Sequence, residues 1–242
     1  MRSYSKKLPA RWIRCLSIAA ALFLLAGYAE AGIVTYSGQD DGALIGGPFP
    51  LSTAAQTSFM AAASGLGPIS TITFENLALG FYSPIAAAPG VSVTLAAPNY
   101  GDGFSGISTT TYGNLYGFNV TPGGSKWLGS PGGAATFAFS SPTQSFGLWL
   151  TGVQTVFTST FTLTFFDGSS ETLSLPINVD GGAAYFGFTD AGALISSITI
   201  TNQSNDAWGI DDVTYSSAVP EPSTLLLLGG ALPLLGLAYR RR

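Results

Sequence analysis

The stretch that most clearly indicates the fold is Phe161-Thr-Leu-Thr-Phe-Phe-Asp-Gly-Ser-Ser-Glu-Thr-Leu-Ser-Leu175. Residues 161–166 and 169–175 are rich in Thr, Phe and Leu, and largely alternate apolar with polar side chains, as half-buried strands do. The Asp167-Gly168 pair between them can supply the positive φ angles of a two-residue type I′ turn. The stretch therefore predicts a β-hairpin.

Similar short runs lie on both sides of this hairpin, separated by Gly, Pro, Asn and Asp. They are residues 69–75, 91–95, 135–139, 145–150, 184–188, 195–201 and 210–215. One short helix is expected through 56–64, with Ser52 or Thr53 as its cap and Gly65 as its stop. Strands at this spacing without helices between them predict an all-β domain over residues 32–217, a single two-sheet sandwich of the jelly-roll kind.

The charged residues are distributed unevenly along the chain. Lys126 is the single basic residue between Gly32 and Val219, whereas the same span holds eleven acidic residues, a net charge of −10. Nucleic-acid binding depends on clustered Lys and Arg, so this class of function is excluded. The same acidic surface attracts cations such as Ca²⁺.

Cysteine and histidine chemistry is absent from the predicted domain. The chain has one Cys, at position 15, and no His. Disulfides, thiolate catalysis, Cys-based zinc sites and a Ser-His-Asp triad are therefore excluded.

Residues 1–31 have the three parts of a secretory signal peptide. Five basic residues precede an apolar run over 15–28, and Ala29-Glu30-Ala31 supplies small residues at the −3 and −1 positions. The apolar run is about 14 residues, shorter than the roughly 20 of a membrane-spanning helix. We expect export by the secretion machinery and cleavage after Ala31.

The C-terminal segment, residues 219–242, also has three parts in order. Pro220-Glu221-Pro222 is followed by an apolar stretch over 225–239 and then by Arg240, Arg241 and Arg242. Fifteen residues make a helix about 22 Å long, short for a hydrocarbon core of roughly 30 Å. The terminal arginines favour a cytoplasmic C-terminus and place the domain outside the inner membrane.

This arrangement resembles the PEP-CTERM sorting signal of exopolysaccharide-producing Gram-negative bacteria. The resemblance implies an exosortase as the processing partner, a transient transmembrane anchor in the inner membrane, and release to the cell surface or extracellular space. The alternative is a plain tail anchor. Four internal motifs, at 71–75, 146–147, 166–168 and 209–213, also resemble PEP-CTERM ectodomains of unknown function, which look like jelly-roll carbohydrate-binding modules.

Three acidic residues form a candidate metal site. Glu75 closes one predicted strand, and Asp211 and Asp212 lie in the last one. Because the first and last strands of a jelly roll commonly run side by side, these carboxylates are expected to meet and to suit Ca²⁺, which prefers oxygen ligands. The alternative is that they face solvent or accept hydrogen bonds from loops. Asp40-Asp41-Gly42 is read as a polar turn.

Four aromatic residues in Gly-rich connections form a candidate glycan site. They are Tyr100, Tyr112, Tyr116 and Trp127. Rings on loops can stack on sugars, and the alternative is that they close the edge of the core. Trp149 and Trp208 are expected in the core. No pair of carboxylates is marked out as a glycosidase pair, so no catalytic residue is assigned.

Together these features predict a non-enzymatic, exported and exosortase-sorted surface or matrix protein. Its sandwich is expected to bind calcium and glycan, with exopolysaccharide as the candidate ligand. Two other classes stay open: a purely structural matrix or adhesion protein without a defined ligand, and a secreted glycan-active enzyme.

Overall fold

The computed structural model describes residues 32–96, 104–155, 161–166, 170–175, 177–192 and 194–217. The predicted signal peptide, the predicted sorting segment and Tyr100 lie outside these residues. No helix in the described part of the chain is long and apolar enough to cross a membrane.

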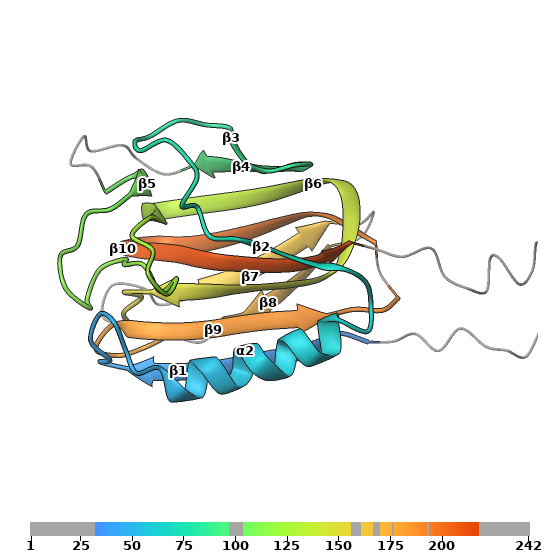
Figure 1. The fold of residues 1–242 in the computed structure, drawn as a ribbon, viewed down its shortest axis with the longest axis horizontal. Coiled ribbons are helices and arrows are strands. Elements are labelled where there is room, and N and C mark those ends of the chain that lie inside the picture. Colours follow the sequence, from blue (N-terminus) through green and yellow to red (C-terminus); the bar gives the residue numbers. More distant parts are fainter. Residues whose placement is uncertain are drawn as a thin grey trace, which may run out of the picture. The chain divides into compact units, whose positions relative to one another are not determined.

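The described residues form one helix and ten strands (Figure 1). In chain order these are β1 (Val34–Asp41), α2 (Pro50–Ala63), β2 (Ile69–Ile72), β3 (Ile85–Ala88), β4 (Val91–Ala96), β5 (Gly106–Ser108), β6 (Trp127–Thr151), β7 (Phe161–Phe166), β8 (Ser170–Ser174), β9 (Gly182–Thr189) and β10 (Ile195–Ser217). The predicted all-β class with one helix is confirmed. The strands β1, β3 and β5 were not anticipated, and Asp40 and Asp41, expected in a polar turn, lie in β1.

Two long strands, β6 and β10, join the strands into a sandwich-like arrangement. The central path of the sheet is β1-β9-β6-β10-β7-β8. The first half of β6 pairs with β4, and its second half pairs with β9. In the same way β10 pairs first with β7 and, at its end, with β2. Each long strand therefore contributes to two layers, one containing β3, β4, β7 and β8 and the other containing β1, β2 and β9.

The main core contains apolar side chains from both layers. Phe137 and Ile198 come from the first halves of β6 and β10, and Phe146, Phe186 and Val213 come from the other layer. Strand β9 is buried along its whole length because both of its faces are covered. Ala184 and Phe186 contribute to the main core, whereas the alternate residues Ala183 and Tyr185 pack with Phe59 of α2.

The predicted helix is present, but it begins earlier than expected and its cap was predicted wrongly. It starts at Pro50, after Phe49, with no side-chain cap of its own. Neither Ser52 nor Thr53 caps it. Instead, the carboxylate of Asp40 on β1 accepts hydrogen bonds from the backbone N–H groups of Leu51 (3.1 Å) and Ser52 (2.8 Å). A carboxylate at this end also complements the helix dipole.

The predicted hairpin is confirmed as the antiparallel pair β7–β8. Its register places Phe166 opposite Ser170, which leaves three residues in the connection instead of the expected two. The connection itself lies outside the described residues. The side-by-side placement of the strand at 69–75 and the last strand is also confirmed, since Ile72 pairs with Val213 and Ile69 with Ser216.

Candidate functional site: a polar junction and an aromatic pair

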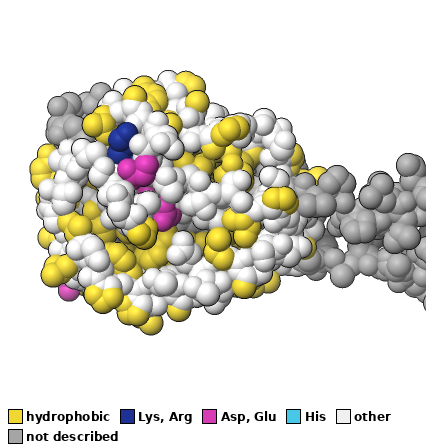
Figure 2. Space-filling model, in the orientation of Figure 1, with side chains coloured by type: hydrophobic (Ala, Val, Ile, Leu, Met, Phe, Trp, Pro, Cys, Tyr) yellow, Lys and Arg dark blue, Asp and Glu magenta, His cyan; other side chains and the backbone are white. Residues whose placement is uncertain are grey.

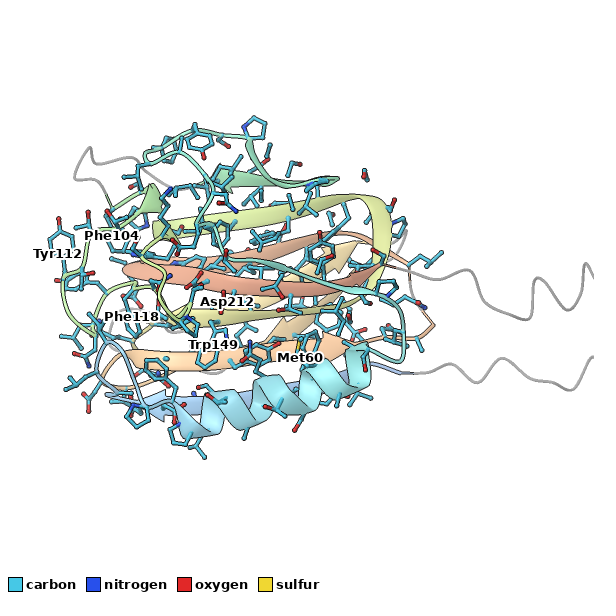
Figure 3. The ribbon with its side chains drawn as sticks, in the orientation of Figure 1. Met60, Phe104, Tyr112, Phe118, Trp149 and Asp212 are labelled. Atoms are coloured by element: carbon cyan, nitrogen blue, oxygen red, sulfur yellow. The ribbon has the colours of Figure 1, made fainter. Side chains whose placement is uncertain are left out.

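The β2–β10 pairing brings the three predicted carboxylates together. The pairing ends at Ile72 and Val213, and beyond it a loop over 119–126 lies against both chains. The Asn119 side chain joins them, since its Nδ2 lies 3.0 Å from Glu75 Oε1 and 3.0 Å from Asp211 Oδ2. We call this group, made of Glu75, Asn119, Thr121, Lys126, Asp211 and Asp212, the Asp211 junction. Figure 3 shows Asp212 on β10 beside this loop.

Asp211 is fully buried, and hydrogen-bond donors surround its carboxylate. Its Oδ2 accepts from the backbone N–H of Val120 (2.7 Å) and of Thr121 (3.2 Å), and from Asn119, while Oδ1 accepts from the N–H of Asp212 (2.9 Å). Burial raises the pKa of Asp211 to about 7, with a further contribution from the charge of Asp212, against the lowering effect of the backbone hydrogen bonds. Asp211 thus anchors the loop to β10, because its carboxylate accepts hydrogen bonds from the backbone N–H groups of the loop.

Glu75 and Lys126 tie the same loop to the chain that follows β2. Glu75 Oε1 accepts from the backbone N–H groups of Ser125 and Lys126, both at 2.8 Å. The Lys126 ammonium donates to the carbonyl oxygens of Glu75 (2.8 Å) and Leu77 (2.7 Å). Figure 2 shows this single basic side chain of the described surface next to acidic groups. Lys126 therefore holds the backbone at Glu75 and Leu77 against the loop.

The backbone is strained on both sides of the junction. Among the described residues, Phe74 (φ 62°) and Asp212 (φ 43°) are the non-glycine positions with positive φ. Such conformations are costly and persist only where neighbouring contacts hold them. At Asp212 the contact is the Thr121 hydroxyl, which donates to its Oδ1 at 2.6 Å. Burial raises the pKa of Asp212, and the nearby charge of Glu75 adds to the rise.

These contacts change the predicted metal site. No cluster of three or more His, Cys, Asp or Glu side chains in the described part of the chain is arranged to hold a metal ion. Asp211 is not a free ligand, because it is buried and both of its oxygens accept hydrogen bonds. Within the described contacts, Glu75 Oε2 and Asp212 Oδ2 accept none. The alternative expected from the sequence, hydrogen bonding to a loop, describes Asp211. Calcium binding stays a prediction, with two candidate ligands.

Two of the predicted aromatic residues form an exposed pair. Tyr112 and Tyr116 are 52% and 42% exposed, and their ring centroids are 5.7 Å apart. Both lie against the buried ring of Phe104, at 6.4 Å each. Phe104 in turn contacts Trp127 edge to face at 5.0 Å. The pair therefore combines half-exposed rings with a packed aromatic base, and Figure 3 labels Tyr112 and Phe104 at this end of the molecule.

Trp127 itself is part of that base, so its predicted role in sugar stacking is wrong. It is fully buried at the start of β6. Gly117 and Gly209 lie so close to its ring that a Cβ on Gly117 would come within 2.2 Å of it. The ring thus has no face open to a ligand. Trp149 and Trp208 are buried, as expected.

Polar residues that the sequence analysis missed hold the loop carrying the Tyr pair. The Thr151 hydroxyl accepts from the N–H of Phe118 at 2.9 Å and lies 3.0 Å from its carbonyl oxygen. The Asn114 side chain donates to the carbonyl oxygen of Asp180 (3.1 Å), and Gln154 donates to that of Leu115. A polar residue just after an apolar strand, such as Thr151 after Leu150, was the available signal.

The fold defines this chain as a β-sandwich-like domain with one helix. The C-terminal residues 218–242 match the PEP-CTERM protein-sorting motif. This motif indicates a protein that is exported, anchored in the membrane and sorted to the cell surface by an exosortase. No curated protein matches the chain.

Several solved structures resemble the domain at low identity. The K2 cleaved adhesin domain of Lys-gingipain has a TM-score of 0.40 and 15% identity, and the match covers 62% of this chain and 99% of that one. The K1 cleaved adhesin domain of Lys-gingipain from Porphyromonas gingivalis W83 has a TM-score of 0.36 and 14% identity, covering 63% and 100%. TmCBM61 in complex with β-1,4-galactotriose has a TM-score of 0.23 and 11% identity, covering 60% and 95%.

Proposed function

We propose that this chain is a non-enzymatic surface or extracellular-matrix protein whose sandwich binds glycan chains through Tyr112 and Tyr116. The observation that carries the proposal is the exposure of two neighbouring rings on a packed aromatic base. The sorting motif supports a location at the cell surface, where an exopolysaccharide would be within reach of the domain. The exosortase, the secretion machinery and, transiently, the inner membrane are the expected partners.

The physical basis of glycan binding is the fit between a ring and a sugar. A Tyr ring offers an apolar face for the C–H groups of a pyranose, and its hydroxyl group offers a hydrogen bond to a sugar hydroxyl. Binding costs less when the side chains are already held in place. The contacts of Tyr112 and Tyr116 with Phe104, and the anchoring of their loop by Asn114 and Thr151, supply this order.

The junction chemistry favours a binding protein over a glycosidase. Glycoside hydrolysis requires two carboxyl groups about 5–10 Å apart, on opposite sides of the scissile bond. Asp211 has the raised pKa of a general acid, but it is fully buried and its oxygens accept backbone hydrogen bonds. A sugar at the surface does not reach it. We therefore assign no catalytic residue.

Binding of the exported protein to an array of bacterial glycans tests the proposal. We expect retention by at least one glycan, with a loss of about tenfold or more for Tyr112→Ala and for Tyr116→Ala, as removal of a stacking ring costs about 1.4 kcal/mol. Leu194→Ala is the control, since Leu194 is similarly exposed but precedes β10. Binding to no glycan would leave the structural matrix protein as the better description. Turnover of the glycan would indicate an enzyme.

Calcium binding at the junction is a second candidate function. It is favoured by the closeness of Glu75 and Asp212, whose charges interact, and by the one oxygen that each keeps without a hydrogen bond within the described contacts. Two carboxylates with loop carbonyls and water can supply the oxygen ligands that Ca²⁺ prefers. The ion would neutralise repulsion that Lys126 does not, since its ammonium donates to carbonyl oxygens.

Processing of the tail is tested by mass spectrometry. We expect the mature protein in the envelope or medium to span roughly residues 32–220, because cleavage would follow Ala31 and would remove the apolar segment after the Pro220–Pro222 motif. A mature pool that still carries Arg240–Arg242 would contradict exosortase processing and favour a plain tail anchor.

A further inference from the structure

Three loops meet at one end of the sandwich. They are residues 42–49, 112–118 and 178–181, here called the loop end. The N–H of Gly42 donates to the carbonyl oxygen of Gly181 (3.3 Å), and the N–H of Gly182 to that of Asn114 (2.7 Å). The loop end lies opposite the end of the sandwich where β10 ends. At that opposite end, Ser216 of β10 pairs with Ser145, and Ser145 pairs with Thr189.

The loop end is the most apolar exposed part of the described domain. Six of its ten exposed large hydrophobic side chains lie there: Leu44, Ile45, Tyr112, Leu115, Tyr116 and Val179. Figure 2 shows hydrophobic side chains at the left, where these loops lie in Figure 1, as well as elsewhere on this face. The loops are in close backbone contact, since a Cβ on Gly181 would come within 2.9 Å of Leu115 Cα. Contiguous exposed apolar surface of this kind marks interaction sites.

The charges around this surface are all of one sign. Asp180 lies in the third of these loops and Asp41 ends β1 just before the first, and Asp41 Oδ1 accepts from the N–H groups of Val179 (2.9 Å) and Asp180 (2.8 Å). The single basic residue of the span 32–219, Lys126, is engaged at the junction. An anionic ligand at the loop end would meet carboxylates without a compensating cation, whereas sugar hydroxyls can donate hydrogen bonds to them.

From these observations, and resting on the proposed function, we propose that the ligand is a neutral polysaccharide chain bound in extended form across the loop end. The rings of Tyr112 and Tyr116 stack on one or two sugar units, and neighbouring units lie over Leu115, Val179 and the loop with Leu44. The carboxylates of Asp41 and Asp180 flank this path, where they accept hydrogen bonds from hydroxyl groups and repel uronic-acid or sulfated chains.

A second copy of this chain fits the surface less well than a neutral polymer. Each copy carries a net charge of −10 over residues 32–219, with Asp180 in the loop end and Asp41 directly beside it. Bringing two such surfaces together costs electrostatic free energy that apolar burial would first have to offset. A neutral chain has no such cost.

The test compares matched oligosaccharides on the exported protein. The protein is titrated with three groups of ligands at about 10 mM salt, with chelator present. These are the hexasaccharides of glucose, galactose and mannose, their C6-oxidised uronic-acid counterparts, and the neutral disaccharides. For at least one sugar, the neutral hexasaccharide should bind at least about tenfold more tightly than the acidic one, and more tightly than the disaccharide. About 0.5 M NaCl should reduce the difference between the neutral and the acidic ligand. Asp180→Asn should also reduce it, and Asp190→Asn, in the turn after β9, should not.

Each result separates this inference from the proposed function. Equal or tighter binding of the acidic hexasaccharides, lost in Tyr112→Ala, overturns the inference and keeps glycan binding. Equal affinity for disaccharide and hexasaccharide overturns the extended mode. Binding to no glycan overturns both the inference and the proposed function. A concentration-dependent dimer that Leu44→Ser abolishes would identify a second copy as the occupant.

Discussion

The Asp211 junction and the Tyr112–Tyr116 pair share the segment between β5 and β6, which carries the pair and the junction residues Asn119 and Thr121, yet the two regions differ in how their side chains are satisfied. At the junction the carboxylate of Asp211 is buried and accepts several hydrogen bonds. In the segment that leads into the junction loop, Tyr112 and Tyr116 keep about half of their surface exposed. At the junction the polar side chains hold the loop in place. At the Tyr112–Tyr116 pair the rings stay about half exposed.

This difference separates residues that make the fold from residues that can meet a ligand. In the sequence analysis the acidic residues of one region and the aromatic residues of the other were both candidate binding residues. Burial alone removes Trp127 from the surface chemistry, and burial together with hydrogen bonds to both carboxylate oxygens removes Asp211. Stability should therefore respond mainly to the junction, and glycan binding mainly to the exposed rings.

The largest expected effect is that of Asp211→Ala on stability. The substitution removes the acceptor for the N–H groups of Val120, Thr121 and Asp212, which would be left without partners. The free energy of unfolding should fall by about 2–4 kcal/mol, or roughly 5–15 °C in Tm. Thermal denaturation followed by circular dichroism measures it.

The matched control is Asp190→Ala, which removes a carboxylate with a single local hydrogen bond, to the N–H of Gly192. We expect a loss below about 1 kcal/mol for it. Equal losses for Asp190→Ala and Asp211→Ala would mean that the junction does not hold the loop.

Calcium should have the next largest effect if Glu75 and Asp212 bind it. An ion that binds only the folded state stabilises by about 2.7 kcal/mol at a hundredfold excess over its dissociation constant. The domain should melt at a higher temperature in millimolar Ca²⁺ than in chelator, and Glu75→Gln or Asp212→Asn should weaken this response. Asp211→Asn should preserve it, because Asp211 has no free oxygen. Identical melting curves after the metal has been stripped would exclude the site.

Much of the fold and part of the site could be predicted from the sequence. The alternation of apolar and polar residues identified the β7–β8 hairpin and the strands β2 and β10, because a period of two reflects which face of a strand is buried. Strands β2 and β10 also lie side by side, as expected. That neighbourhood was enough to bring Glu75 close to Asp211 and Asp212. The predicted jelly-roll connectivity stays a prediction.

The rest depended on tertiary contacts that leave no local pattern. The cap of α2 comes from Asp40 on another strand, and Trp127 is buried because Gly117 and Gly209 allow close approach to its ring. Asn119 and Thr151 are ordinary polar residues in the sequence, and only the fold places them beside Asp211 and Phe118. Residue type alone does not show which of these side chains are buried or which groups they contact.

The pH dependence of stability should be opposite to the usual acid effect. Burial raises the pKa of Asp211 from 3.8 to about 7, so between these values the folded state holds a proton that the unfolded state releases. Its contribution to stability is complete below about 3.8 and is lost as the pH rises through about 7. Asp212, whose pKa is also raised, acts in the same direction. Tm should thus rise from pH 8 to pH 5, and Asp211→Asn should flatten the profile. A Tm that falls over this range equally in both proteins would contradict a raised pKa at Asp211.

The smallest expected effect on stability is that of the exposed rings, and it completes the comparison. Tyr112→Ala removes a ring that is half exposed, so the lost burial should cost about 1 kcal/mol or less. Phe104→Leu, in the buried base beneath the pair, is the informative partner: it disturbs the packing of both Tyr rings and should lower Tm and glycan affinity together. Thermal melts and glycan titrations of the two variants distinguish the roles. If Tyr112→Ala lowers Tm as much as Phe104→Leu does, the Tyr ring is part of the core edge, and its exposure is incidental. If Tyr112→Ala abolishes glycan binding while Tm stays within a few degrees, the ring contacts the ligand, and the stable loop beneath it serves to present that ring.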